Sequence, residues 1–434
     1  MALGKERARI PGTQDLAIVI GAGRSGLGAA KLLANKKVRT RLLERDSKVL
    51  SEEEKKELQS KGIELVFGEH LPEHFADASF IIPSPGMPLT KLEELLPHSA
   101  VRPEIISELE LAYRYLNDEP ILAVTGTSGK TTTASLAAAM LKMQGYTVFL
   151  GGNIGTPLSE YILDGRKADV LVLECSSFQL QGCTTFCPRV AVLLNISPNH
   201  LDHHKDMAEY ADSKFRIFRC QEKGDLAILG PGMESISENF AIPARKLFLS
   251  SPASFSDMRL LGAHNRLNAE AAWQAARFFG VSLANAQKSV AAFSPLPHRL
   301  ENVGTYDGIT YINDSKCTTV AALKVALEAF DRPVRLLAGG KFKGGDLSQL
   351  IPLLREKVSQ VALFGGSREY FESAWTGVVP ISWHNTLKEA VARLRGSSSA
   401  GDIILLAPAT SSYDQYHNYM ERGDDFRQIA RGLK

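Results

Sequence analysis

The sequence predicts an α/β protein of three domains: an N-terminal Rossmann-like domain, a central P-loop ATPase-type parallel sheet, and a C-terminal Rossmann-like domain. Its 434 residues suit roughly three domains of about 150 residues each. Short apolar runs alternate with helix-length segments along the chain, which is the rhythm of βαβ units. Proline and turn residues near Asn117 and Pro297 predict domains of residues 1–117, 118–296 and 297–434.

Each third of the chain contains its own series of predicted strands. Most of these runs are apolar throughout, as expected of parallel strands that are covered on both faces. Helical patterns at 26–36 and 134–143 follow the first strand of their domains. The predicted strands lie within residues 16–23, 38–44, 79–86, 120–125, 146–152, 168–177, 189–197, 225–230, 309–315, 333–340, 360–366 and 402–409.

The composition narrows the class of function. Hydrophobic residues make up 44% of the chain and charged residues 23%, enough apolar material for several buried cores. The net charge of +2 gives no global field for nucleic acid or an anionic membrane. No apolar run approaches the ~18–20 residues that cross a bilayer, and the charged N-terminus lacks the apolar stretch of a secretory signal. We therefore expect a cytoplasmic protein that binds neither nucleic acid nor membrane.

The sharpest local signal is the segment TGTSGKTT, which stands between a predicted strand and a predicted helix. Such a turn directs backbone N–H groups and the positive end of a helix at a phosphate chain. Lys130 suits the β and γ phosphates of a nucleotide, and the Thr131 hydroxyl suits the accompanying Mg²⁺. Val124 replaces the glycine of the standard P-loop, and the alternative is a plain turn with a solvated lysine. The phosphate-binding residues predicted here are Gly126, Thr127, Ser128, Gly129, Lys130, Thr131 and Thr132.

A second glycine motif, residues 21–26, follows the first strand, and Glu44 ends the next one. This pattern is typical of dinucleotide sites, in which the acidic residue binds a ribose hydroxyl. A UDP-sugar fits the motif as well as NAD, because both place a diphosphate on a helix N-terminus. Ser84 and Gly86 would lie at the same edge of the sheet. The alternative is tight strand–helix packing without any ligand.

Polar residues follow several other strands at the edge where parallel sheets bind ligands. Glu174 ends a strand beside the phosphate loop, which is the position of a Mg²⁺ ligand. His200 lies in the cluster NHLDHH after the next strand, whereas the pattern around Lys214 is that of a solvated lysine. In the last third, Asp314 stands where a strand opens into a loop, and the basic glycine loop 339–345 suits a carboxylate or phosphate.

Taken together, the motifs resemble those of the Mur ligase family over nearly the whole chain, from Gly21 to Phe426. The SSFQL, NDSK and SSYDQ strings resemble in particular the branch of that family that adds D-glutamate. The motifs that carry the resemblance are TGTSGKTT, GGNIG, ECSSFQL, NHLDHH, GAHNRLNAEAA, PHRLE, NDSKCTT and APATSSYDQYHNYMERGDDF.

The resemblance implies an ATP-dependent amide ligase of cytoplasmic peptidoglycan precursor synthesis. It implies that the enzyme joins D-glutamate to UDP-N-acetylmuramoyl-L-alanine through an acyl phosphate and releases ADP and phosphate. It also implies two Mg²⁺ ions, a monomer, an N-terminal domain for the UDP moiety, and a C-terminal domain that closes over the site. Phosphorylation would make the carboxylate oxygen a leaving group, which agrees with the cationic character of the phosphate loop.

The same resemblance assigns roles to individual residues. Lys130 would stabilise the transferred phosphoryl group, Thr131 and Glu174 would hold one Mg²⁺, and His200 and Lys214 would hold the second. Lys214 falls at the family's carbamylated lysine, although an ordinary lysine is neutral only about once in 2,500 molecules at pH 7. Further ATP contacts would be Asn265, Asn268, His298, Arg299, Asp314 and Lys316.

Two further sets of residues match the family's substrate positions. The UDP-sugar set departs from the family pattern at Glu44 and Arg45, where aspartate and threonine are common, and Lys341 stands where an acidic residue is familiar. The UDP-sugar set is Arg24, Ser25, Gly26, Glu44, Arg45, Ser84, Gly86, Asn153, Ser176 and Gln179. The D-glutamate set is Thr318, Lys343, Ser412, Tyr413 and Tyr419.

Three alternatives remain open at this point. A sister amide ligase, such as a folylpolyglutamate synthase or another Mur enzyme, would share the chemistry, but the DNPR string of the diaminopimelate- and lysine-adding branch is absent. An NAD(P)-dependent oxidoreductase would use residues 21–26 and leave the phosphate loop unexplained. A P-loop kinase or a non-catalytic nucleotide-binding regulator would need no amino-acid acceptor.

Overall fold

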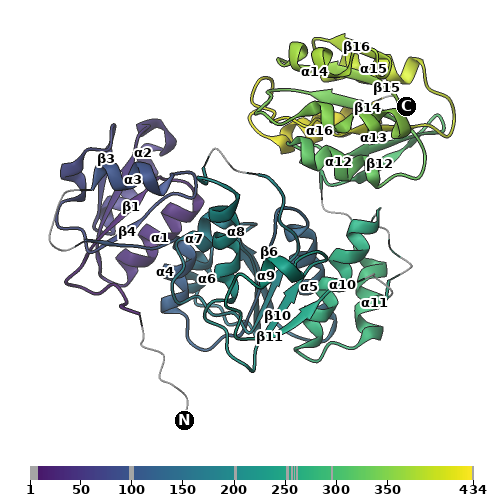
Figure 1. Ribbon diagram of the computed structural model, residues 1–434. Helices are drawn as coiled ribbons and strands as arrows, with labels where there is room; N and C mark the ends of the chain where they lie inside the picture. The colour runs from purple at the N-terminus through teal and green to yellow at the C-terminus, as the bar shows by residue number, and fades with distance from the viewer. Residues whose placement is uncertain are drawn as a thin grey trace. The chain divides into compact units, whose positions relative to one another are not determined.

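A computed structural model describes the chain as three α/β regions, each built on its own sheet (Figure 1). Helices flank the sheets, as the alternating sequence pattern predicts. The predicted fold class is therefore confirmed. The described residues are 8–96, 102–199, 203–250, 254–255, 258, 260, 262–294 and 297–432.

The N-terminal sheet has five parallel strands in the order β3-β2-β1-β4-β5. Its glycine turn joins β1 to α1, and the second half of α1 buries leucines and alanines against the sheet. The strands are β1 (Leu16–Ile20), β2 (Arg39–Glu44), β3 (Ile63–Phe67), β4 (Phe80–Ile82) and β5 (Glu104–Ile105). The α-helices are α1 (Arg24–Asn35), α2 (Glu52–Ser60), α3 (Leu89–Leu95) and α4 (Glu108–Tyr115).

The central sheet has six parallel strands in the order β11-β10-β9-β6-β8-β7. Strand β6, which leads into the phosphate loop, lies between β8 and β9 and is buried over its whole length. The strands are β6 (Ile121–Thr125), β7 (Val148–Gly152), β8 (Val170–Glu174), β9 (Val190–Leu193), β10 (Leu226–Leu229) and β11 (Arg245–Phe248). The α-helices are α5 (Lys130–Met143), α6 (Leu158–Asp164), α7 (Ser177–Gln181), α8 (Met207–Phe215), α9 (Glu234–Ser237), α10 (Ala263–Arg277) and α11 (Leu283–Ala292).

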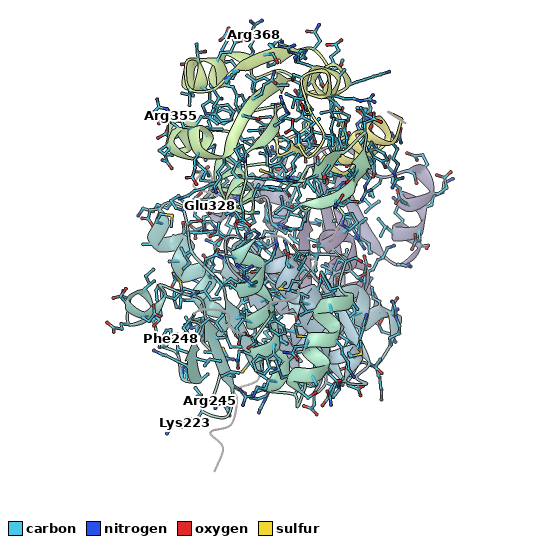
Figure 2. The ribbon with its side chains drawn as sticks, turned by 90° about the vertical axis from the view of Figure 1, so that its right-hand side faces the viewer. Lys223, Arg245, Phe248, Glu328, Arg355 and Arg368 are labelled. Atoms are coloured by element: carbon cyan, nitrogen blue, oxygen red, sulfur yellow. The ribbon has the colours of Figure 1, made fainter. Side chains whose placement is uncertain are left out.

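Strand β11 forms one edge of the central sheet. Arg245 and Phe248 mark its two ends at the outer margin of Figure 2, and both side chains are exposed. Charged side chains on an edge strand oppose pairing with another chain. This edge is therefore a solvated boundary, and it lies five strands away from β7 at the opposite edge.

The C-terminal sheet has the order β12-β13-β17-β14-β15-β16, and only the β12–β13 pair is antiparallel. The sequence pattern predicted β13, β14, β15 and β17 but missed the β12 and β16 strands at the two edges. The strands are β12 (Glu301–Tyr306), β13 (Ile309–Asn313), β14 (Val334–Gly339), β15 (Val358–Phe364), β16 (Ile381–His384) and β17 (Ile403–Leu406). The α-helices are α12 (Val320–Glu328), α13 (Ile351–Lys357), α14 (Arg368–Trp375), α15 (Leu387–Gly396) and α16 (Tyr419–Arg431).

The chain forms two compact units. The first contains residues up to Ser254 together with Asn268–Ser289, and the second contains Phe255–Leu267 and the chain from Val290 onward. Within the first unit, α4 fastens the N-terminal sheet to the central one. Its buried Glu110 binds Arg114 at 2.9 Å and accepts the backbone N–H groups of Thr185 and Phe186 at 3.0 Å each. These bonds satisfy the buried carboxylate and join α4 to the loop that precedes the strand Val190–Leu193.

Among the described residues, no helix is both long enough and apolar enough to pass through a membrane.

Candidate active site

The phosphate loop is a tight turn whose shape requires glycine. Gly126 has φ +147° and Gly129 has φ +85°, backbone conformations that side chains rarely adopt. A Cβ atom at Gly129 would lie 2.4 Å from the Asn268 Oδ1 atom. The loop is also held from β9, because the Ser128 N–H donates to Asn195 Oδ1 at 2.9 Å and the Thr127 N–H donates to the Asn195 carbonyl at 3.0 Å.

Two lysines meet at this loop. The Nζ atoms of Lys130 and Lys214 both donate to the Gly126 carbonyl oxygen at 2.9 Å, and Lys130 also donates to the Thr127 carbonyl at 2.9 Å. Lys214 comes from α8 and is only 2% exposed, so the solvated position predicted from its sequence pattern is wrong. The pattern failed because the burial of Lys214 depends on the phosphate loop, which is 88 residues distant in sequence.

The burial of Lys214 changes its acid–base behaviour. Desolvation, together with the nearby charge of Lys130, lowers the pKa of Lys214 to about 6, although Cys175 and Glu174 act in the opposite direction. The ammonium lies 4.6 Å from the centre of the Tyr210 ring, an attractive contact for the charged form. A lysine with this pKa is about 90% neutral at pH 7 and is therefore a nucleophile.

A buried carboxylate stands next to the loop. Glu174 ends β8 in register with Val124 of β6 and is 2% exposed. Its Oε1 atom accepts a hydrogen bond of 2.7 Å from Asn153 Nδ2, while Oε2 is buried with no hydrogen-bond partner among the described residues. A buried carboxylate oxygen in that state suits a cation. Thr131, in the first turn of α5, is buried at the same end of the sheet.

The neighbouring helix α7 begins with a capping box that occupies two predicted substrate residues. Ser176 Oγ accepts the Gln179 N–H at 3.2 Å, and Gln179 Oε1 accepts the Ser176 N–H at 3.0 Å. His200 lies outside the described residues, but the nearby His204 Nε2 atom is 2.9 Å from Ser177 Oγ. Part of the predicted histidine cluster therefore faces α7.

The glycine turn of the N-terminal sheet is closed by its own acidic residue. Glu44 Oε2 accepts the Ala22 N–H at 2.8 Å, and a Cβ atom at Gly26 would lie 1.9 Å from the Gly21 carbonyl oxygen. Arg24 is largely exposed, 3.7 Å from Glu160 of α6. Tight packing, which the sequence allowed as an alternative, therefore accounts for at least part of this motif.

Several predicted UDP-sugar residues nonetheless converge. Ser25 after β1, Ser84 after β4 and Gln179 of α7 line one small cavity of about 20 Å³. Arg45 and Gly86 lie in the loops that follow β2 and β4 at the same edge of the sheet. The N-terminal and central regions thus both contribute residues to this small cavity, whose lining also includes Met87, Leu89 and Phe178.

The second unit has a cluster of its own. The His298 ring is buried with its Nδ1 atom 3.1 Å from Asn313 Nδ2, and its backbone has φ +63°. Burial raises the pKa of Asp314 from its ordinary value of 3.8 to about 7, against the opposing charge of Arg299. Lys316 Nζ lies over the Tyr419 ring at 5.2 Å. The four predicted ATP-binding residues between positions 298 and 316 therefore lie together around the end of β13.

The predicted D-glutamate residues lie on neighbouring loops of the same unit. Lys343 Nζ lies over the ring of Tyr413 at 5.3 Å, and Tyr413 is 63% exposed while the preceding Ser412 is buried. Thr318 follows β13, directly before the N-cap residue of α12. Asn265 belongs to this unit, whereas Asn268, three residues later on α10, belongs to the first unit beside the phosphate loop.

Sequence reasoning missed a buried arginine under these loops. Arg422 of α16 donates to the Ser315 Oγ atom at 3.0 Å, the Ser315 carbonyl at 2.9 Å and the Thr410 carbonyl at 3.0 Å. It was hidden within the YMERGDDF string, because neither charge nor spacing distinguishes a buried arginine from a surface one. Asn195 and Tyr210, which hold the phosphate loop, were missed for the same reason.

Three α/β sheets, with a glycine phosphate loop beside a buried lysine and a buried carboxylate, are typical of a nucleotide-binding protein. The family comparisons match each region in turn. Residues 15–101 match the Mur ligase MurD-like N-terminal domain, residues 124–247 the Mur ligase middle domain, and residues 298–410 the Mur ligase glutamate ligase domain.

Relatives and solved structures agree. The chain is 59% identical to the UDP-N-acetylmuramoylalanine--D-glutamate ligase of Desulfovibrio desulfuricans and 56% identical to that of Nitratidesulfovibrio vulgaris, covering 100% of each chain in both cases. The fold matches the MurF ligase of Thermotoga maritima in complex with ADP, with TM-score 0.62, 17% identity, and coverage of 91% of this chain and 96% of that one. The chain belongs to the Mur ligase family, and the predicted resemblance is confirmed.

Proposed function

We propose that this chain joins D-glutamate to UDP-N-acetylmuramoyl-L-alanine at the expense of ATP, in the synthesis of peptidoglycan precursors. The relatives that share 56–59% of its residues over their full length carry the name of that activity. The observation on which the chemistry rests is the meeting of Lys130, Lys214 and Glu174 at the phosphate loop. We take ATP to be the nucleotide, because family members with this fold are described with ADP.

The reaction needs an activated acid, because a free carboxylate resists attack by an amine. The carboxylate of the L-alanine arm attacks the γ-phosphorus, the bond to the β-phosphate oxygen breaks, and ADP leaves. The amine of D-glutamate then adds to the acyl carbon, loses a proton, and the phosphate departs from the tetrahedral intermediate. Lys130 and the loop N–H groups would stabilise the negative charge that moves onto the phosphate oxygens.

The enzyme would use two Mg²⁺ ions. The Oε2 atom of Glu174, which has no hydrogen-bond partner among the described residues, and the Thr131 hydroxyl would hold one ion. For the other ion, the family resemblance assigns the modified Lys214 and His200, which lies outside the described residues. When bound, the ions neutralise phosphate charge and polarise the reacting oxygens. The buried donors of the chain would orient the phosphates, and their burial would exclude water.

Lys214 would act as a carbamate. Its neutral amine attacks carbon dioxide, forms an N–C bond and loses one proton, which replaces a neutral amine with an anionic oxygen donor. Burial supplies the neutral amine by lowering the pKa of Lys214 to about 6. In the solvated state that the sequence pattern indicates, only about one such lysine in 2,500 would be neutral at pH 7.

Substrate recognition would be divided between the two units. The first unit would bind the UDP-sugar, and three of the predicted substrate residues, Ser25, Ser84 and Gln179, lie together there at one small cavity. The UDP-sugar set named above would complete that site, including Arg24, Gly26, Glu44, Arg45, Gly86, Asn153 and Ser176. In the second unit, Lys343 would pair with the side-chain carboxylate of D-glutamate beside Thr318, Ser412, Tyr413 and Tyr419, and the cluster around Asp314 would face ATP.

The setting of the enzyme follows from the same proposal. We take the enzyme to be a cytoplasmic monomer that acts on small molecules and binds neither nucleic acid nor membrane. Its three domains would end at residues 117, 296 and 434. An NAD-dependent oxidoreductase is disfavoured, because it would leave the phosphate loop and the lysines that meet there without a role.

The direct test is phosphate release from ATP with UDP-N-acetylmuramoyl-L-alanine and a panel of D- and L-amino acids. Release that requires D-glutamate and yields one amide per phosphate supports the proposal. Release that needs no amino acid, or that prefers an L-amino acid, contradicts it. Saturable NADH binding without UDP binding would favour the oxidoreductase instead.

A further inference from the structure

The turn that follows β7 is built against Glu174. Strands β7 and β8 pair in parallel with Gly152 opposite Glu174. Gly152 has φ +95°, and a Cβ atom there would lie 2.4 Å from the Glu174 carbonyl oxygen. Glycine is therefore required for the chain to pass this close to Glu174.

This close passage anchors the backbone of the next residue. The Asn153 N–H donates to the Glu174 carbonyl oxygen at 2.8 Å, and the Gly152 N–H donates to the Thr156 carbonyl oxygen at 2.9 Å. The backbone of Asn153 is thus fixed to Glu174, the residue that its side chain also contacts. Few conformations of the asparagine side chain remain to be ordered when it bonds to the carboxylate.

The Asn153 side chain returns to the Glu174 carboxylate. Its Nδ2 atom donates to Oε1 at 2.7 Å, while the other carboxylate oxygen, Oε2, is buried and has no hydrogen-bond partner among the described residues. One oxygen is therefore held and the other is left for a ligand. An amide is suited to this task, because it donates to a carboxylate without neutralising it as a lysine or arginine would.

We propose that Asn153 is a positioning residue that fixes Glu174 as a Mg²⁺ ligand. The inference rests on the proposed function, in which Glu174 binds the metal. Hydrogen-bond partners of metal ligands commonly change metal affinity by about 10–100-fold when they are removed. Asn153 is exposed, so its replacement by alanine removes this bond with little loss of packing.

The test measures metal affinity directly, without turnover. Mn²⁺, which has an electron paramagnetic resonance signal, is titrated into the full-length protein with a non-hydrolysable ATP analogue. The variants are Asn153→Ala, Glu174→Gln and the double variant, with Asn239→Ala as a matched exposed asparagine of the same unit. UDP binding and thermal unfolding are measured on each protein to show that it is folded.

We expect Asn153→Ala to weaken Mn²⁺ binding about tenfold, Glu174→Gln to weaken it at least as much, and the double variant to match Glu174→Gln. Asn239→Ala should match the wild type. The Mg²⁺ concentration for half-maximal rate should rise about tenfold in Asn153→Ala.

Three results would overturn the inference or its foundation in distinguishable ways. Normal Mn²⁺ affinity in Asn153→Ala would show that its hydrogen bond to Glu174 does not tune the metal site. Additive losses in the double variant would show that Asn153 acts independently of Glu174. If Glu174→Gln itself binds Mn²⁺ normally, the metal site of the proposed function is wrong. If Asn153→Ala is unfolded, Asn153→Leu, whose side chain has a similar size and no hydrogen-bond donor, takes its place with the same outcomes.

Discussion

The chain contains two glycine turns of the same design, and they differ in what surrounds them. Both residues 21–26 and residues 125–132 join a parallel strand to a helix N-terminus. At the second turn, Lys130 and Lys214 donate to one carbonyl and a buried carboxylate lies on the adjacent strand. At the first turn, Glu44 accepts a loop N–H, and Arg24, which belongs to the turn, is largely exposed.

This difference shows that the turn itself supplies only backbone donors. What makes a turn suited to phosphoryl transfer is the buried charge that other elements bring to it, here from α8 and β8. A turn closed by its own acidic residue is suited to binding and to packing. The predictions below test that contrast, beginning with the largest expected effect.

Lys130→Ala should lower kcat by roughly 10³-fold, because it removes a cation from the transferred phosphoryl group. UDP affinity, measured by calorimetry, should stay within about twofold, since the first turn is untouched. Lys142→Ala, a matched exposed lysine on the same helix, should behave as wild type. Near-normal turnover of Lys130→Ala would remove the functional distinction between the two turns.

Lys214→Ala should lower activity roughly 100-fold and raise the Mg²⁺ requirement steeply, because a buried metal-binding group is lost. Wild-type enzyme held in carbon dioxide-free buffer should lose activity and regain it on addition of bicarbonate, whereas Lys214→Ala should not respond. An unchanged Mg²⁺ titration in Lys214→Ala would exclude this lysine from the site.

Asp314→Asn should increase the free energy of unfolding above neutral pH, because it removes a buried carboxyl group that is costly to ionise. The folded protein holds the Asp314 proton up to about pH 7, while the unfolded chain releases it near 3.8, so the wild type loses stability as pH rises through this window. Asp314→Asn should abolish that loss and raise the free energy of unfolding at pH 8 by up to about 4 kcal/mol. Chemical denaturation at pH 4.5 and pH 8 measures it, and equal stabilities of the two proteins at pH 8 would contradict the assignment.

Gly129→Ala should cost about 1–3 kcal/mol of stability and weaken ATP binding, because the φ of +85° and the contact with Asn268 both exclude a Cβ. Gly23→Ala is the control in the first turn, since no atom lies within 4 Å of its Cβ position and its φ is −71°. Thermal unfolding distinguishes them. Equal losses in the two variants would mean that the turns are equally constrained.

Glu44→Gln should have the smallest effect. An amide retains an acceptor for the Ala22 N–H but removes the charge, so UDP affinity should change by less than about fivefold and ATP affinity should not change. Isothermal titration with each nucleotide measures both. A large loss of ATP binding would show that the first turn serves the phosphate loop's ligand.

The strand series was predictable because parallel strands that are buried on both faces are apolar throughout. Strands β6, β8, β9 and β10 all show this pattern. Strands β11 and β16 were missed because edge strands are only partly buried and carry polar residues, as in RKLF. The phosphate loop was predictable from local sequence alone, since its glycines and lysine are contiguous.

The rest of the site depends on contacts between segments that are distant in the sequence. A local sequence pattern does not reveal such contacts. Lys214 reads as a surface lysine until α8 is packed against the loop, and Arg422 reads as a surface arginine until α16 covers the ends of β13 and β17. The resemblance to the family identified Lys214 but could not supply its environment. Its lowered pKa is a property of the folded chain.

The central claim is that ATP activates a carboxylate by phosphorylating it, and oxygen labelling tests this claim most directly. UDP-N-acetylmuramoyl-L-alanine labelled with ¹⁸O in the alanine carboxylate is converted with ATP and D-glutamate, and the released phosphate is examined by mass spectrometry. The account predicts one ¹⁸O atom in each phosphate, carried there from the acid. Phosphate without the label, formed alongside the amide, would contradict it.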